Sequence, residues 1–314
     1  MPLTKVYLTG ATGRLGSAVL GRTRAIPLVR KPSGLKNELI TDFSSAQLKR
    51  IFRDAACVIH LAGSVDTLDE RKLQVANVEL TRRVVAALPQ GCRIVFSSSI
   101  SVYGKNPAQL PADEDTRANP DSAYARSKYS AEKIVSSHRN HVILRIGTLY
   151  GPGFGDYYRV LGMICSGRMR IIGDGGNRIP FVHVIDAADA AVASIRKGRG
   201  TYVIAGEPLT QREIYALASS ELGVPMPAKS VPRFVASALA SVQEFAYHHL
   251  GGRKPPFTSE HVGVLSCDRV FDCRRARKSL GFSPRRLEQG IRAMVKDYAA
   301  LGARQKAGFY SPPE

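Results

Sequence analysis

The sequence predicts an α/β fold built on a doubly wound parallel sheet. Three observations carry this prediction: a glycine loop that opens at Gly10, a serine run that ends at Ser99, and Tyr124 followed four residues later by Lys128. The first two follow apolar runs typical of buried strands, and the third opens a helix. In an open sheet of this kind, ligands bind at the carboxyl ends of the strands.

The glycine loop is preceded by a short apolar run and followed by a helical pattern. Gly10, Gly13 and Gly16 are spaced three residues apart. The first glycine permits a tight turn, the second lets backbone N–H groups approach a pyrophosphate, and the third lets the helix pack close to the strand. A flexible surface turn is the alternative interpretation, and the position directly after the first strand counts against it.

Two cations follow the second expected strand, which covers residues 25–29. Dinucleotide folds usually carry an acidic residue here, which binds the adenosine ribose 2′-hydroxyl. This chain has Arg30 and Lys31 instead. Because they match a 2′-phosphate, the sequence favours NADP over NAD. Membership of a general basic surface is the alternative interpretation.

The next two segments add weaker signals. Asp42, which precedes Phe43, is expected either to meet the adenine amino group or to cap a helix. The apolar run 57–63 ends in small residues, as expected where backbone passes under a cofactor. His60 is interpreted as a strand residue, because no second ligand stands at metal spacing, and no metal site is expected.

The strand expected at 93–99 ends in three hydroxyls, which can donate hydrogen bonds to a carbonyl oxygen. The i,i+4 spacing of Tyr124 and Lys128 places the phenol and the ammonium on one helix face. A free tyrosine has a pKa near 10, and a neighbouring lysine and a positive nicotinamide ring both favour its phenolate. Tyr124 is therefore predicted to act as an acid or base.

The chain resembles the extended short-chain dehydrogenase/reductase superfamily, also called the NAD-dependent epimerase/dehydratase family. The matching stretches cover nearly the whole chain: 9–16, 60–63, Asn77, 97–104, Tyr124 with Lys128, 144–153 and 181–186. The resemblance implies that Ser99 and Tyr124 bracket the reacting carbonyl or alcohol, and that Lys128 holds the nicotinamide ribose. Ser98 is the nearest competitor for the serine role. The residues expected at the cofactor are Gly10, Thr12, Gly13, Arg14, Leu15, Gly16, Arg30, Lys31, Asp42, Phe43, Leu61, Ala62, Gly63, Asn77, Ser97, Tyr124, Lys128 and Ile146.

The resemblance also implies a second, smaller C-terminal domain, and the length of 314 residues suffices for two domains. Residues 1–150 are expected to form a Rossmann-type dinucleotide-binding domain, with a return to it near 181–204, and residues 151–314 mainly a substrate-binding domain. A homodimer through helices near 70–88 and 122–138 is a family-level expectation.

The composition is strongly basic, with 45 Lys and Arg against 26 Asp and Glu and a formal net charge of +19. Nucleic-acid binding is not expected, because no aromatic-interleaved basic motif occurs. Five cysteines without C-x-x-C spacing predict neither disulfides nor a metal site, and a cytoplasmic location is expected.

A semi-apolar stretch runs from Val231 to Leu250, and its charged and polar residues exclude a membrane span. It is expected to cover the substrate pocket, with an interfacial membrane helix as the alternative. The chain begins without a signal-peptide pattern.

Two features indicate which reaction to expect. Sugar-nucleotide members of the family commonly place an arginine directly before the segment that corresponds to 181–183, where this chain has Ile179 and Pro180, with Arg178 displaced by one residue. The predicted NADP preference fits a reductase that exchanges its cofactor at each turnover. The sequence therefore predicts an NADP-preferring reductase or dehydrogenase of a ketone or alcohol. A nucleotide-sugar 4-epimerase with NAD and a non-catalytic cofactor-sensing or scaffold protein are the alternatives.

Overall fold

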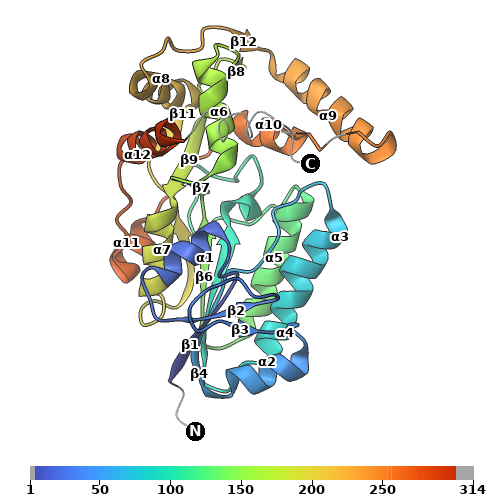
Figure 1. The fold of residues 1–314 in the computed structure, drawn as a ribbon, viewed down its shortest axis with the longest axis vertical. Helices are drawn as coiled ribbons and strands as arrows, with labels where there is room; N and C mark the ends of the chain where they lie inside the picture. Colours follow the sequence, from blue (N-terminus) through green and yellow to red (C-terminus); the bar gives the residue numbers. More distant parts are fainter. Residues whose placement is uncertain (1–3, 253, 256, 302–314) are drawn as a thin grey trace. The chain divides into compact units, whose positions relative to one another are not determined.

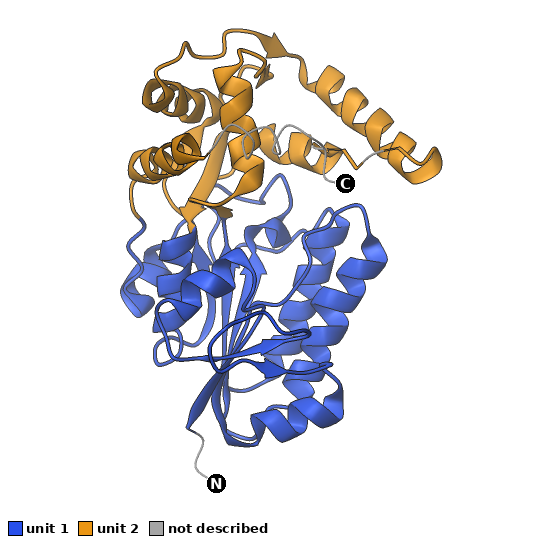
Figure 2. Cartoon of the chain, in the orientation of Figure 1, with its two compact units in different colours: residues 1–147, 184–205, 271–284 blue, residues 148–183, 206–270, 285–314 orange. Residues whose placement is uncertain are grey.

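The computed structural model describes residues 4–252, 254–255 and 257–301. The chain divides into two compact units, which are coloured separately in Figure 2. The first comprises residues 1–147, 184–205 and 271–284, and the second comprises residues 148–183, 206–270 and 285–314.

The first unit contains a seven-stranded parallel sheet with the order β10-β6-β5-β4-β1-β2-β3 (Figure 1). This arrangement confirms the predicted α/β fold class. The strand order reverses between β1 and β4, and the crevice at such a point is where doubly wound sheets bind ligands. The strands are β1 (Lys5–Thr9), β2 (Ile26–Val29), β3 (Leu39–Ile40), β4 (Ala55–His60), β5 (Arg93–Ser99), β6 (His141–Ile146) and β10 (Gly200–Ile204).

Helices cover both faces of this sheet. On one face α2, α4 and α5 pack against one another, and on the other α7 packs against α1 and α11. The bounds are α1 (Arg14–Leu20), α2 (Ser45–Ile51), α3 (Glu70–Leu73), α4 (Leu80–Ala86), α5 (Ala123–Ser136), α7 (Val184–Ala193) and α11 (Arg274–Leu280), with short 3₁₀ turns at Phe52–Asp54 and Ile100–Tyr103 and a π-helical turn, η2, at Gln74–Glu79.

Residues 271–284 lie in the first unit, although the sequence analysis assigned this region mainly to the substrate domain. Phe271 forms a parallel bridge with Ala112, and the Asp272 N–H donates to the Ala112 carbonyl oxygen at 2.8 Å. α11 then packs against β10 at the edge of the large sheet. This return depends on pairing between residues about 160 positions apart, which local patterns do not reveal.

Among its described residues the second unit has two small sheets and five helices, and its hydrophobic core draws on three of these helices. β9 pairs in parallel with β7 and antiparallel with β11, while β8 pairs with β12. None of the helices in the described part of the chain combines the length and hydropathy needed to cross a membrane. The elements are β7 (Thr148–Tyr150), α6 (Gly155–Cys165), β8 (Ile171–Ile172), β9 (Arg178–His183), β11 (Pro208–Thr210), α8 (Gln211–Leu222), β12 (Ser230–Val231), α9 (Arg233–His249), α10 (Ser259–Leu265) and α12 (Leu287–Ala300).

Candidate active site

The glycine loop connects β1 to α1 in a form that only glycine permits at two positions. Gly10 has φ +72°, and a β-carbon there would lie 2.6 Å from the Ala62 nitrogen. A β-carbon on Gly16 would overlap the Gly10 carbonyl oxygen. Gly13 precedes α1 without a side-chain cap, so the first amides of the helix are open to an anion. The loop therefore fits the pyrophosphate of a dinucleotide.

A buried hydrogen-bond chain ties this loop to the neighbouring strand. His60 Nδ1 lies 2.7 Å from Thr9 Oγ1, and His60 Nε2 lies 2.9 Å from Thr81 Oγ1. Because the Thr81 hydroxyl donates to the Asn77 carbonyl oxygen at 2.6 Å, Thr81 accepts from His60, and His60 carries its proton on Nε2. Burial lowers the pKa of His60 to about 3, so it is a neutral structural residue.

Asn77 lies in the π-helical turn η2 and organises the backbone after β4. Its Oδ1 accepts from the Ser64 N–H at 2.8 Å, and its Nδ2 donates to the Ser64 carbonyl oxygen at 3.0 Å and to Ser127 Oγ at 2.9 Å. A β-carbon on Gly63 would lie 2.6 Å from Asn77 Oδ1 and 3.9 Å from Lys128 Nζ. Single π-turns within helices are frequent at functional sites, and this one joins the β4 end to α5.

Tyr124 and Lys128 project from the first turns of α5, which begins after Ser122. The Ser122 hydroxyl caps the helix by accepting from the Ala125 N–H at 3.2 Å. Burial raises the pKa of Tyr124, and a hydrogen bond with Ser99 opposes that rise. Burial lowers the pKa of Lys128 to about 8, although the charge of Glu132 opposes the shift. The Lys128 ammonium also lies 4.5 Å from the centre of the Phe96 ring.

The alternation of side chains along β5 separates the two candidate serines. Ser99 interacts with Tyr124, and its Oγ also lies 3.1 Å from both the nitrogen and the Oγ of Ser101. Ser98 is buried and donates to Glu132 Oε1 at 2.5 Å. Because the Ser98 hydroxyl already donates to a buried carboxylate, Ser99 is the serine that can hydrogen-bond the same substrate oxygen as Tyr124.

Glu132 and Arg145 form a buried ion pair behind this site, which the sequence analysis did not single out. Arg145 donates from Nε to Oε1 at 3.0 Å and from Nη2 to Oε2 at 2.9 Å, while its Nη1 donates to the Tyr103 hydroxyl at 2.9 Å. Burial favours a lower pKa for Arg145, but the hydrogen bonds and the charge of Glu132 outweigh this effect and raise the pKa. The only local signals were a carboxylate four residues after Lys128 and an arginine inside an apolar strand.

The cations expected at the adenosine end are both exposed at the end of β2. The Arg30 guanidinium lies 5.8 Å from the centre of the Phe43 ring. That ring belongs to the buried core, and the Phe43 N–H already donates to Thr41 Oγ1 at 3.1 Å. Phe43 therefore acts as a support for Arg30.

Asp42 does not cap α2. Its Oδ1 accepts from the Ser44 N–H at 2.7 Å, which lowers the pKa of the carboxyl, and Ser44 is the N-cap residue. The interpretation of Asp42 as a helix cap is thus wrong, because the helix begins at Ser45 and its N-cap lies two residues after Asp42. An exposed carboxylate at this edge stays available to a nucleotide base.

The other residues expected at the cofactor divide by exposure. Those with open side chains can touch a ligand directly, whereas those with buried side chains shape the backbone. Thr12 and Arg14 are exposed, Leu61, Ala62 and Ser97 are half-buried, and Leu15 and Ile146 are buried.

Arg178 in the second unit is held by a carboxylate of its own unit. Its Nε donates to Asp268 at 2.9 and 3.2 Å, its Nη2 donates to Asp268 Oδ2 at 2.5 Å, and its N–H donates to Oδ1 at 2.9 Å. This pairing raises the pKa of Arg178 and lowers that of Asp268. An arginine whose fork is already occupied is poorly placed to take a substrate pyrophosphate.

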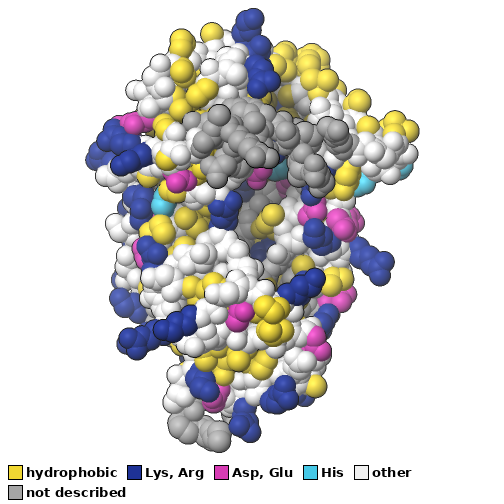
Figure 3. Space-filling model, viewed as in Figure 1, with side chains coloured by type: hydrophobic (Ala, Val, Ile, Leu, Met, Phe, Trp, Pro, Cys, Tyr) yellow, Lys and Arg dark blue, Asp and Glu magenta, His cyan; other side chains and the backbone are white. Residues whose placement is uncertain are grey.

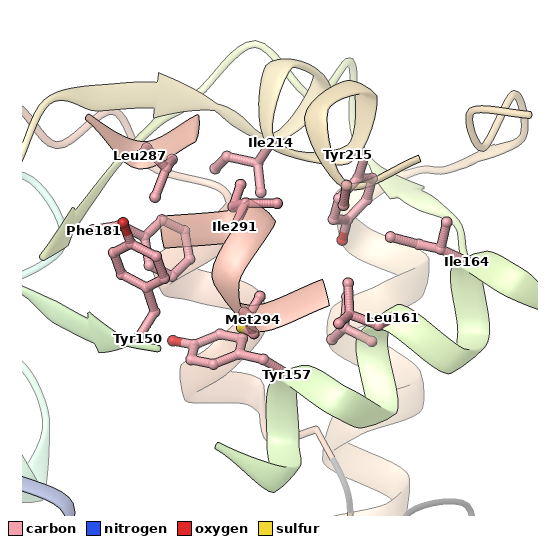
Figure 4. Close-up of a pocket in the computed structure, with 12 residues that line it drawn as sticks. Tyr150, Tyr157, Leu161, Ile164, Phe181, Ile214, Tyr215, Leu287, Ile291 and Met294 are labelled. Carbon is pink, nitrogen blue, oxygen red and sulfur yellow. The ribbon is translucent and has the colours of Figure 1, made fainter. Parts of the chain in front are cut away.

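A small apolar cavity of about 40 Å³ lies in the core of the second unit (Figure 4). Side chains from α6, α8 and α12 converge on it, among them Tyr157, Tyr215 and Ile291. A β-carbon on Gly290 would overlap the Tyr150 hydroxyl, so glycine permits the close packing beside this cavity. The space is about that of one or two water molecules, and we interpret it as a packing space.

Within the described residues, no group of three or more His, Cys, Asp or Glu side chains is arranged to hold a metal ion. The five cysteines are free thiols. Burial raises the pKa of Cys57 and Cys92 to about 12, so neither is a nucleophile.

Glycine loop, parallel sheet and the Tyr124–Lys128 helix together define a nicotinamide-dependent enzyme of the Rossmann type. Residues 6–205 match the NAD dependent epimerase/dehydratase family, and the chain belongs to this family, the extended short-chain dehydrogenase/reductases. It is an NAD(P)-dependent oxidoreductase or epimerase.

The similar proteins that follow are distant from this chain in sequence. The chain is 27% identical over 289 residues to 3beta-hydroxysteroid-dehydrogenase/decarboxylase isoform 2 of Arabidopsis thaliana, with 82% of this chain but 51% of the relative covered, so it spans about half of that protein. It is 26% identical over 333 residues to 2-alkyl-3-oxoalkanoate reductase of Stenotrophomonas maltophilia (strain K279a), with 94% and 100% covered. The solved structure of MoeE5 in complex with UDP-glucose and NAD shares the fold, with a TM-score of 0.73, 23% identity and 94% and 99% covered.

Proposed function

We propose that this chain is an NADP-preferring reductase or dehydrogenase of a ketone or alcohol, with Ser99, Tyr124 and Lys128 as its catalytic residues. The observation that carries the proposal is the meeting of Tyr124 and Ser99, one helical turn from a buried Lys128. When bound, the nicotinamide supplies or accepts hydride at its C4 atom.

In the reduction direction, the Tyr124 hydroxyl gives its proton to the carbonyl oxygen, and Ser99 donates a hydrogen bond to the same oxygen. Because burial raises the pKa of Tyr124, the phenol carries its proton near neutral pH. With a pKa of about 8, Lys128 is mostly cationic at pH 7, which favours the phenolate left after proton transfer.

The proposed preference for NADP rests on Arg30 and Lys31, since both are exposed at the carboxyl end of β2. Contact with Phe43 restricts the Arg30 guanidinium. A restricted guanidinium binds phosphate oxygens with less loss of side-chain freedom.

A reductase is favoured over a nucleotide-sugar epimerase by the pairing of Arg178 with Asp268. The names of two relatives agree, since one acts on 2-alkyl-3-oxoalkanoates and the other on a 3beta-hydroxysteroid. We therefore infer a substrate whose carbonyl or hydroxyl group is carried by a largely apolar skeleton. A homodimer and a cytoplasmic location remain predictions from the sequence.

The test has two parts. The nucleotide released from denatured, freshly purified protein is identified by mass spectrometry, and the stripped protein is titrated with NADPH and NADH. Ketones and aldehydes on alkyl and polycyclic skeletons are then screened with wild type, Tyr124→Phe and the control Tyr129→Phe. Tyr129 lies on the same helix as Tyr124, and its ring contacts Lys133.

We expect NADPH preference and ready exchange. Tyr124→Phe should lower kcat by roughly 10²–10⁴-fold with nucleotide affinity unchanged, while Tyr129→Phe keeps full activity. Tightly retained NAD with interconversion of nucleotide sugars would establish the epimerase instead. Nucleotide binding without turnover of either substrate class would point to a cofactor-sensing or scaffold protein.

A further inference from the structure

Helix α9 presents a broad apolar face to solvent. Phe234, Leu239, Val242 and Phe245 are 75, 59, 67 and 58% exposed, and Leu250, directly after the helix, is 73% exposed. At 100° per residue these five side chains fall within about half of the helix circumference. Figure 3 shows hydrophobic side chains gathered over the region where Figure 1 places α9.

The opposite face of α9 packs against the rest of the second unit. Ala240, the helix's buried residue, lies on that face, which packs against α10. The Glu244 carboxylate, on the same side, accepts from the Ser259 N–H at 2.7 Å and from its hydroxyl at 2.9 Å. The helix is therefore anchored by one side, and its apolar side is presented outward. Contiguous exposed apolar patches of this kind mark interaction sites.

The charges around the patch indicate what covers it. Exposed Lys229 precedes the apolar face, and exposed Lys254 follows it. Between Lys229 and Lys254 the sequence has one acidic residue, Glu244, whose carboxylate is already engaged by Ser259. An apolar centre with cationic ends is complementary to a bilayer surface, where apolar side chains enter the acyl boundary and cations meet anionic headgroups.

A second copy of the chain is a poorer occupant, because each copy carries a formal net charge of +19. We propose that α9 docks on an anionic lipid surface, with Phe234, Val242 and Phe245 inserted and Lys229 and Lys254 at the headgroups. The helix lies along the surface and does not cross it. This docking is independent of the proposed reaction.

Flotation with vesicles tests the proposal. Full-length protein is mixed with vesicles of phosphatidylcholine alone or with phosphatidylglycerol, at low and high salt. The variant Val242→Gln/Phe245→Gln replaces two side chains at the centre of the apolar face without changing the charge. Its control is Leu39→Gln/Ile40→Gln on β3, a second exposed apolar pair (40 and 58% exposed) in the other unit. Phe234→Gln provides a second α9 variant, and far-UV circular dichroism verifies folding.

Wild type and control should float with the anionic vesicles, and less so at high salt. The α9 variant should bind at least roughly tenfold more weakly, because burial of each large apolar side chain contributes about that factor. Lys229→Gln should weaken binding about fivefold.

Three results would overturn the proposal. The first is that wild type does not bind anionic vesicles even at low salt. The second is that the α9 variants bind as well as wild type, which would show that a basic protein is merely adsorbed through its charge. A dimer in sedimentation analysis that dissociates in the α9 variants would assign this face to a second copy.

Discussion

Glu132 lies one helical turn after Lys128 on α5 and receives two hydrogen bonds from Arg145 on β6, at 3.0 and 2.9 Å. Both side chains are at least nine-tenths buried. The pair joins the helix that carries Tyr124 to the sheet that carries Ser99, and it also binds Ser98 and Tyr103. Its geometry therefore sets the distance between the two groups proposed to act on the substrate.

Glu132→Leu should lower the free energy of unfolding by about 3–5 kcal/mol, because it leaves the Arg145 guanidinium buried without its carboxylate. The double variant Glu132→Leu/Arg145→Met should recover much of that loss, since no buried charge remains. Urea unfolding of wild type, both single variants and the double variant measures the coupling. Additive effects of the two substitutions would contradict this view of the pair.

Lys128→Met should abolish reduction yet stabilise the protein by about 1–3 kcal/mol at pH 7, because burial of the ammonium is unfavourable. The folded pKa of about 8 lies below the unfolded value of about 10.5. Wild type therefore carries the full cost below pH 8 and regains stability as the pH rises from 8 to 10.5. Urea unfolding at pH 7 and pH 10 should show the advantage of the variant shrinking with pH. An advantage that is the same at both pH values would indicate a cause other than charge.

Arg30→Glu should raise the Kd for NADPH roughly 10–100-fold and change the Kd for NADH little, because a charge-assisted contact to the 2′-phosphate is lost. Lys36→Glu makes the same charge change at another exposed site between β2 and β3. Fluorescence titrations of the three proteins compare the affinities. If both substitutions weakened NADPH binding equally, Arg30 would contribute only through the general surface charge.

Gly63→Ala should weaken nucleotide binding and lower the free energy of unfolding by about 1–3 kcal/mol. Its β-carbon would lie 2.6 Å from Asn77 Oδ1, so Asn77 must move and release Ser64 or Ser127. Gly21→Ala is the matched control, because its β-carbon would meet no atom closer than 3.7 Å. Nucleotide titration and urea unfolding report both effects. Unchanged binding in Gly63→Ala would show that the Asn77 network is not needed to shape the site.

Two features of the site followed from local sequence, and one did not. Gly10 and Gly16 were predictable because a tight turn before a helix requires missing β-carbons at fixed spacing. Tyr124 and Lys128 were predictable because four residues make one helical turn. The helix that begins at Ser45 was misplaced relative to Asp42, because several capping residues follow one another there and only the folded backbone selects one.

The α/β fold class, the glycine loop and the Tyr124–Lys128 spacing follow from the sequence alone, because each depends on neighbours within a few positions or on a repeated apolar pattern. The other features of the site depend on the tertiary structure. It assigned Ser98 to Glu132 and Ser99 to Tyr124, engaged Arg178 with Asp268, neutralised His60 by burial, and left the apolar face of α9 exposed. These outcomes depend on burial and on partners distant in sequence, which the chain acquires only when it folds.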